Sequence, residues 1–110
     1  MLDEKEFRNK AEEALISLQR ALERASDQHD FEVDSNAGAL SVEFEDPPGK
    51  FVVSPNAPVR QIWVSARAQS FKLDWNAALS AFALPDGRIL HQLMADMVSE
   101  QLGERVSLIG

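Results

Sequence analysis

The first part of the chain places apolar residues at intervals of three and four. These residues are Phe7, Ala11, Ala14, Leu15, Leu18, Leu22 and Ala25. This spacing draws one apolar stripe along an α-helix, with Glu12, Gln19 and Glu23 on the opposite face. Asp3 is expected to cap the helix, with Glu6 three residues later as its capping-box partner. The segment therefore predicts an amphipathic helix whose acids face water.

After Ser26 the period of the pattern changes to two. Phe31 and Val33 alternate with Glu32 and Asp34, and the same alternation returns over residues 40–45. Between these runs, residues 36–38 (Asn-Ala-Gly) are typical of a turn. This pattern predicts a β-hairpin with one apolar face and one strongly acidic face.

Prolines then divide the chain. A third strand is expected near residues 51–53, between a break at residues 47–49 and a second break at residues 55–58. A fourth strand follows over residues 61–66 and a fifth over residues 71–75. Residues 76–84 are ambiguous, and Phe82 and Leu84 could form a short last strand.

The two tryptophans fall on opposite phases of their strands. Trp63 alternates with Ile62 and Val64, so it belongs with the polar face of the fourth strand. Trp75 is in phase with Leu73 and is therefore expected in the core. An exposed aromatic side chain among polar neighbours is typical of an interface anchor.

A second amphipathic stripe follows the turn at Asp86-Gly87. Its apolar residues are Leu90, Leu93, Met94, Met97, Val98 and Leu102. Gly103 is a natural C-cap, and the apolar tail over residues 106–109 is expected to pack against the domain. His91 borders the stripe, which indicates packing or a hydrogen bond rather than metal ligation. The order of elements predicts the α+β class: a two-layer α/β sandwich with both helices on one face of a mainly antiparallel five- to six-stranded sheet, in a single domain over residues 1–110.

Composition narrows the possible functions. The net charge of −7 disfavours nucleic acid and anionic membranes as partners. Residues 1–46 carry 13 of the 18 acidic residues and only 5 of the 11 basic ones, so the acidity is concentrated at the N-terminal end. The absence of cysteine excludes disulfides and thiolate metal sites. With neither a signal-peptide pattern nor a membrane-length apolar run, we expect a cytoplasmic protein.

Several short motifs, in order along the chain, resemble the frataxin family. The most specific is residues 58–65 (Pro-Val-Arg-Gln-Ile-Trp-Val-Ser), which is similar to the family's Gln-Ile/Val-Trp strand preceded by proline. Residues 36–40, 73–75 and 90–93 match in the expected places, and residues 103–107 resemble the tail of bacterial members. The resemblance implies an accessory protein of iron-sulfur cluster assembly. Its implied partners are a cysteine desulfurase and the iron-sulfur scaffold protein.

Acids gather at the end of the first helix and along the first strand. In most proteins such a face only maintains solubility, but like charges concentrated in this way are costly and are not needed for folding. The resemblance implies that this acidic ridge binds iron weakly, as Fe²⁺ or Fe³⁺, and other divalent cations remain open. The expected ligands are Glu23, Asp27, His29, Asp30, Glu32 and Asp34.

The resemblance also implies a surface for the assembly partners. Its acidic part would meet basic residues of the desulfurase, while the sheet face around Trp63 would meet a neighbouring subunit. The residues expected there are Glu12, Glu23, Glu32, Gln61, Trp63, Ser65 and Asp74. We expect a monomer, and the sequence leaves open whether iron drives oligomerisation.

No pattern in the chain indicates autonomous catalysis. It lacks a Ser-His-Asp set, a glycine-rich phosphate loop and an HExxH motif. Weak ferroxidase activity is implied by the family resemblance alone, since the chain has none of the Glu-x-x-His pairs of a di-iron site. Two alternatives stay open: an acidic interaction protein with no metal role, and an iron-storage or ferroxidase-type protein.

Overall fold

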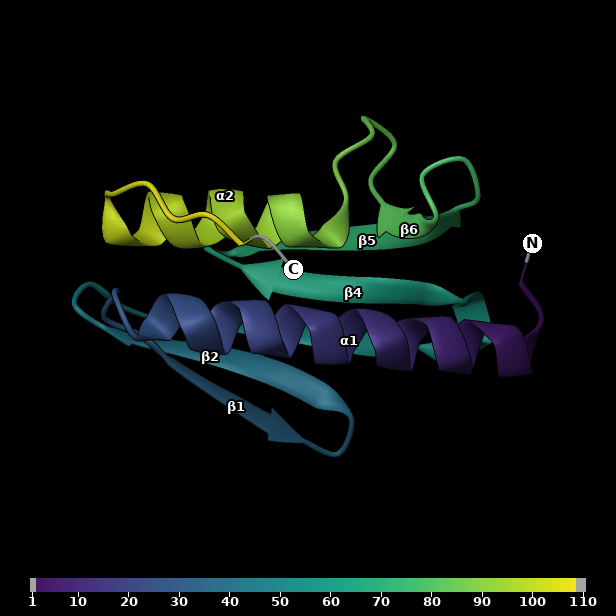
Figure 1. Ribbon diagram of the computed structural model, residues 1–110, viewed down its shortest axis with the longest axis horizontal. Helices are drawn as coiled ribbons and strands as arrows, with labels where there is room; N and C mark the ends of the chain where they lie inside the picture. Colours follow the sequence, from purple (N-terminus) through teal and green to yellow (C-terminus); the bar gives the residue numbers. More distant parts are fainter. Residues whose placement is uncertain (1, 109–110) are drawn as a thin grey trace.

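The computed structural model describes residues 2–108, which form one sheet and two α-helices. The elements are α1 (Glu4–Ser26), β1 (Glu32–Asn36), β2 (Ala39–Glu45), β3 (Pro48–Asn56), the 3-10 turn η1 (Ala57–Val59), β4 (Gln61–Ala66), β5 (Gln69–Asn76), β6 (Ala81–Ala83) and α2 (Leu90–Leu102). The sheet follows the order β1-β2-β3-β4-β5-β6, and every neighbouring pair is antiparallel. Both helices lie side by side on the same face of this sheet (Figure 1). The predicted two-layer α+β sandwich is therefore confirmed, with six strands.

Helix α1 begins and packs as its sequence pattern predicts. The side chain of Asp3 accepts a hydrogen bond from the backbone N–H of Glu6 at 2.8 Å, which satisfies one of the free donors of the first turn. The apolar stripe faces the sheet and buries Phe7, Ala11, Leu15, Leu18, Ala21 and Leu22. At the other end of the chain, α2 ends at Gly103, whose φ of 68° is the left-handed conformation that glycine tolerates best.

Tight turns set the register of the first and fourth hairpins. Ala37 and Gly38 both have positive φ, as do Arg67 and Ala68. Two successive positive φ values are the signature of a two-residue hairpin turn whose twist matches that of the strands. The register places Val33 opposite Val42 on the apolar side of the first hairpin. The predicted separation of an apolar face from an acidic face follows from this register.

The third strand is longer than predicted. Strand β3 runs from Pro48 to Asn56, so the expected break at Pro55 is wrong. Pro55 pairs with Ile62 of β4, whereas the pairing of β3 with β2 already ends at Val53. Beyond Val53, the side of β3 that faced β2 has no neighbouring strand. Proline, which lacks an N–H, can occupy such an edge without the loss of a hydrogen bond between strands.

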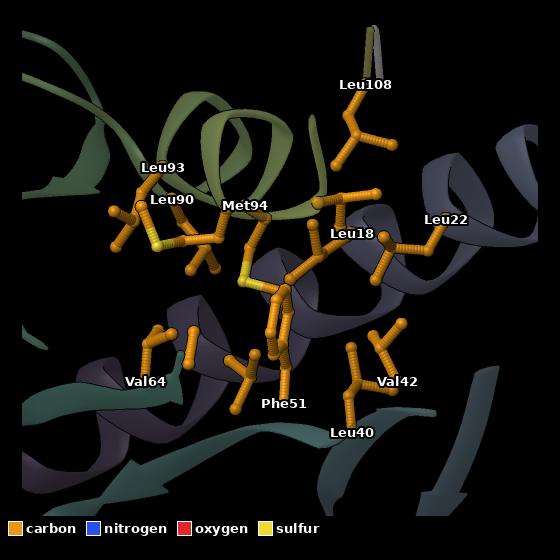
Figure 2. Packing of buried hydrophobic residues seen from close by; sticks show 14 of the residues in the cluster. Leu18, Leu22, Leu40, Val42, Phe51, Val64, Leu90, Leu93, Met94 and Leu108 are labelled. Carbon is orange, nitrogen blue, oxygen red and sulfur yellow. The ribbon is translucent and has the colours of Figure 1, made fainter. Parts of the chain in front are cut away.

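The core lies between the helices and the inner face of the sheet. In Figure 2, Leu18 of α1 and Leu93 and Met94 of α2 point toward Phe51 and Val64 of the strands. Met94 and Met97 are buried, as predicted. Residues 81–83 form the short β6, and Phe82 packs edge-on against Phe7 and Trp75, with centroid distances of 5.7 and 5.3 Å.

One buried polar side chain ties two turns of the sheet to α2. Gln101 donates a hydrogen bond to the carbonyl of Pro47 at 2.8 Å and accepts one from Arg67 at 2.9 Å. The backbone of Gly49 approaches the same amide so closely that a Cβ there would lie 2.9 Å from its Nε2. Packing against the Gln101 amide thus favours glycine at position 49.

The segment after α2 turns back along the helices (Figure 1). Val106 and Leu108 are buried, and Ser99 exchanges hydrogen bonds with the backbone of Val106 at 2.9 and 3.2 Å. The prediction that the apolar tail packs down is confirmed for these residues, while Ile109 lies outside the described range. Neither described helix is long and apolar enough to cross a membrane.

Candidate interaction surface

Strand β4 presents Trp63 on the sheet face that no helix covers. Ile62, Val64 and Ala66 are fully buried under the helices, while Trp63 is 37% exposed and Ser65 is exposed beside it. Strict alternation along a strand produces this division, since successive side chains point to opposite faces. The predicted phase of Trp63 is confirmed.

The indole of Trp63 is held by a short chain of polar contacts. Its Nε1 donates a hydrogen bond to Gln61 Oε1 at 3.0 Å, and Gln61 Nε2 donates to Asp74 Oδ1 at 3.1 Å. The ammonium of Lys72 lies 5.0 Å from the ring centroid, within the range of a cation–π contact. Gln61 and Asp74 are register partners across β4 and β5, as are Trp63 and Lys72. The surface is therefore ordered before any partner arrives.

The residues predicted for this surface come together, with one addition. Gln61, Trp63 and Asp74 are directly linked, and Ser65 lies two pairs further along the same two strands, opposite Ser70. Lys72 was not predicted. Alternation places it on the polar face, and its position over the indole follows from the register that the Arg67-Ala68 turn gives to β4 and β5.

Two of the acids of α1, Glu12 and Glu23, lie at the ends of a straight row on its outer side. Glu12, Ile16, Gln19 and Glu23 are spaced by four, three and four residues, which keeps them within one narrow sector of a helix. We call this row the acidic stripe. Glu12 and Glu23 are exposed, as the interface prediction requires.

On the sheet, acids also meet acids. Glu32 of β1 lies directly opposite Glu43 of β2, and Glu43 in turn faces Lys50 of β3. Like charges directly opposite each other destabilise a pair of strands. Glu32 therefore lies at the open edge of the sheet beside a second negative charge, Glu43, which makes the electrostatic potential at this edge more negative.

The six expected metal ligands are spread along a ridge rather than gathered at a point. Glu23 and Asp27 belong to the end of α1, Asp30 follows in the loop, and Glu32 and Asp34 lie on β1. All five carboxylates are exposed. Among residues 2–108, no three histidine, aspartate or glutamate side chains come close enough to form a metal-binding group.

His29, the remaining expected ligand, already has a partner. Its Nδ1 hydrogen bonds to Glu104 Oε1 at 2.9 Å, which joins the loop after α1 to the segment after α2. Glu104 was not predicted as part of this region. The contact spans 75 positions of sequence, so only the side-by-side arrangement of the two helix ends reveals it.

His91 is used structurally, as predicted. Its Nε2 shares a hydrogen bond with Ser17 Oγ at 3.1 Å, which links α2 to α1. Burial between the helices lowers the pKa of His91, and the contact with Ser17 offsets this only in part. The neutral imidazole is thus the form that the folded protein favours.

Together, these features are typical of a protein that recognises partners through its surface. The domain is an acidic α+β sandwich that exposes a pre-ordered aromatic site on one face and a row of carboxylates on the other layer. Such a combination is typical of proteins that act by docking onto partners, where aromatic anchors and complementary charge provide the recognition.

Comparison with known proteins identifies the family. The model of the frataxin-like domain matches residues 1–104. The chain is 35% identical to the iron-sulfur cluster assembly protein CyaY of Dechloromonas aromatica over 97% of its own length and 99% of the relative's. It is 33% identical to CyaY of Azotobacter vinelandii, covering 86% and 87% of the two chains. The chain belongs to the frataxin-like family.

A solved structure supports the fold independently. The frataxin of Psychromonas ingrahamii superposes with a TM-score of 0.83, covering 99% of this chain and 100% of that one. The sequence identity is only 19%, so this similarity concerns the fold. The family expected from the short motifs is confirmed by the family model and the CyaY relatives, and the predicted fold by this structure.

Proposed function

We propose that this protein is an accessory regulator of iron-sulfur cluster assembly that docks onto the complex of cysteine desulfurase and scaffold protein. Its membership of the frataxin-like family and the names of its CyaY relatives support a role in this pathway. The observation that carries the docking part is the hydrogen-bonded chain of Trp63, Gln61 and Asp74 on an uncovered sheet face. An aromatic side chain held in place loses little freedom on binding, which favours an interface anchor.

In this proposal the acidic side of the molecule meets the desulfurase. Glu12 and Glu23 on α1 and Glu32 on β1 present exposed carboxylates, and residues 1–46 hold 13 acids against 5 basic residues. Complementary charge of this kind speeds encounter with a basic surface and orients the two proteins. The face with Trp63 would then contact the neighbouring scaffold subunit.

Iron binding is the second part of the proposal. Carboxylates and one imidazole are suitable donors for iron, and the ridge from Glu23 to Asp34 carries them in excess. Because these side chains are exposed and do not converge, an ion would have to draw them together, and binding would be weak. Iron would be a cargo or a signal at this ridge rather than a resident cofactor.

The docking proposal is tested by titrating purified desulfurase with this protein at different salt concentrations. Raising salt from about 0.05 M to about 0.5 M shortens the screening length several-fold, so the affinity should fall markedly. A variant with Glu23, Asp30 and Glu32 changed to amides should bind more weakly at low salt. The matched control changes Glu6, Glu13 and Glu100 to glutamine, which removes the same charge from other exposed positions. Equal loss in both variants would indicate net charge alone, and no association at all would refute the docking.

The metal proposal is tested by iron titration of the same proteins. Saturable binding at low stoichiometry, lost in the ridge variant and kept in the control, is the expected result. Dioxygen-dependent turnover of ferrous iron would favour the ferroxidase alternative. An absence of binding would favour an acidic interaction protein with no metal role.

A further inference from the structure

An exposed isoleucine stands in the middle of the acidic stripe. Ile16 lies between Glu12 and Glu23 on the same side of α1, and its side chain is 42% exposed. The amphipathic pattern of α1 does not need it there, since the buried face is already complete with Leu15 and Leu18. Burial of this side chain in an interface would release free energy that a serine or glutamine could not provide.

Ile16 borders an open groove of about 440 Å³. The groove separates α1 from the turn between β1 and β2, and the end of β3 and η1 close it at one side. Its apolar lining includes small and medium-sized side chains from three elements, namely Ala11, Leu15 and Ile16 of α1, Ala39 and Leu40 of β2, and Ala57 of η1. Because several of these side chains are small, the helix and the hairpin turn leave a hollow where larger residues would fill the space.

The rim of this groove carries an unneutralised carboxylate. Glu12 lines the groove and forms no hydrogen bond or ion pair with any residue from 2 to 108. The cation nearest along the helix on this rim, Arg8, is already bound to Glu4 at 2.7 Å. A ligand that enters the groove therefore meets apolar surface below and negative charge at the edge.

We propose that Ile16 and this groove form an apolar anchor site within the acidic stripe. Its occupant is a segment of the desulfurase that inserts one apolar side chain flanked by lysine or arginine. This inference rests on the proposed docking function and deepens it. Continuity supports it, since Glu12 and Glu23 of the proposed desulfurase surface lie on either side of Ile16 along the helix. An apolar centre with a polar rim is also typical of protein interfaces.

Charge and apolar contact have different salt dependences, and this difference provides the test. Ile16→Ser should weaken binding to purified desulfurase about tenfold, and by the same factor at low and at high salt. Glu12→Gln should instead weaken binding mainly at low salt, because screening removes its contribution. The matched controls are Leu79→Ser, a similarly exposed apolar residue (48% against 42%) between β5 and β6, and Glu13→Gln, the adjacent exposed carboxylate on α1. Thermal unfolding of each variant verifies that the fold is kept.

A footprint provides an independent measurement. The chain has no cysteine, so Gln19→Cys places a single thiol in the groove lining while leaving Ile16 in place. Saturating desulfurase should slow its alkylation at least about tenfold, as read from the mass of this chain, and should leave the alkylation of Leu79→Cys unchanged.

The outcomes separate this inference from the function on which it rests. If the unmodified protein binds desulfurase but Ile16→Ser binds equally well, or the thiol at position 19 stays reactive, the anchor site is refuted and the docking function stands. If the unmodified protein shows no association, the docking function is refuted and the anchor site with it. Protection at position 19 together with a salt-independent loss for Ile16→Ser supports both.

Discussion

Trp63 and Trp75 lie on neighbouring strands, and each has a lysine over its ring, but they face opposite sides of the sheet. Lys72 lies 5.0 Å from the centroid of Trp63, and Lys10 of α1 lies 5.6 Å from that of Trp75. Trp63 is surrounded by polar groups of its own sheet face. Trp75 packs edge-on against the buried Phe82 and is half-buried under α1.

The difference shows how one residue type serves two purposes in a small domain. On the helix side of the sheet, Trp75 packs at the edge of the core, and the lysine over its ring belongs to α1. On the open side, the indole is ordered by Gln61 and Asp74, and its lysine comes from the next strand. Stability is therefore expected to depend on Trp75, and recognition on Trp63.

The largest expected effect is a loss of stability in Trp75→Ala. Truncation of a buried aromatic residue costs about 3–5 kcal/mol, and because Trp75 is half-buried we expect about 2–4 kcal/mol. Chemical denaturation measures the change. Trp75 was predicted to be buried in the core; the structure confirms that it faces the core but leaves it only half-buried. A loss below that of Trp63→Ala would reverse the comparison.

The next effect is on binding in Trp63→Ala. Folding should change by less than about 1 kcal/mol, as for most surface substitutions, whereas affinity for the assembly complex should fall by about 2 kcal/mol, as for an interface anchor. Isothermal titration against the desulfurase and scaffold complex measures the second value. As a further check, a soluble quencher should reach Trp63 more readily than Trp75, and the quenched emission should disappear in Trp63→Ala.

A smaller effect concerns the two lysines. Lys10→Met and Lys72→Met each remove one cation from an indole face, and a cation–π contact at an exposed site contributes about 0.5–1 kcal/mol. We expect Lys10→Met to lower the free energy of unfolding and Lys72→Met to weaken partner binding. The double variants with Trp75→Ala and Trp63→Ala isolate the pair contributions, and additive results would show that neither contact matters.

The smallest expected effect is the pH dependence contributed by His91, which lies near Trp75 between the helices. Burial lowers its pKa below the ordinary value of 6.5, so the unfolded chain binds a proton that the folded protein disfavours. The sign follows directly: stability should fall as pH drops below about 6.5, until the lowered pKa of the folded state is reached. His91→Gln should flatten this part of the stability curve. An unchanged curve in that variant would assign the pH dependence to other groups.

Local pattern determined much of this protein. The amphipathic stripes of α1 and α2, the cap at Asp3 and the left-handed Gly103 follow from short-range spacing and backbone preference, which operate within a few residues. Alternation also assigned Trp63 to the outer face and Trp75 to the inner one. The error at Pro55 arose because a proline breaks a strand only where its missing N–H would be paired.

Only the tertiary structure decided which distant side chains meet. The contact of His29 with Glu104, the position of Gln101 against Gly49 and the groove beside Ile16 all join segments far apart in the chain. Each depends on strand register or on the relative placement of two helices, to which every residue of the core contributes. Periodicity indicates which face a residue occupies, whereas its neighbours on that face are selected by the packing of the whole domain.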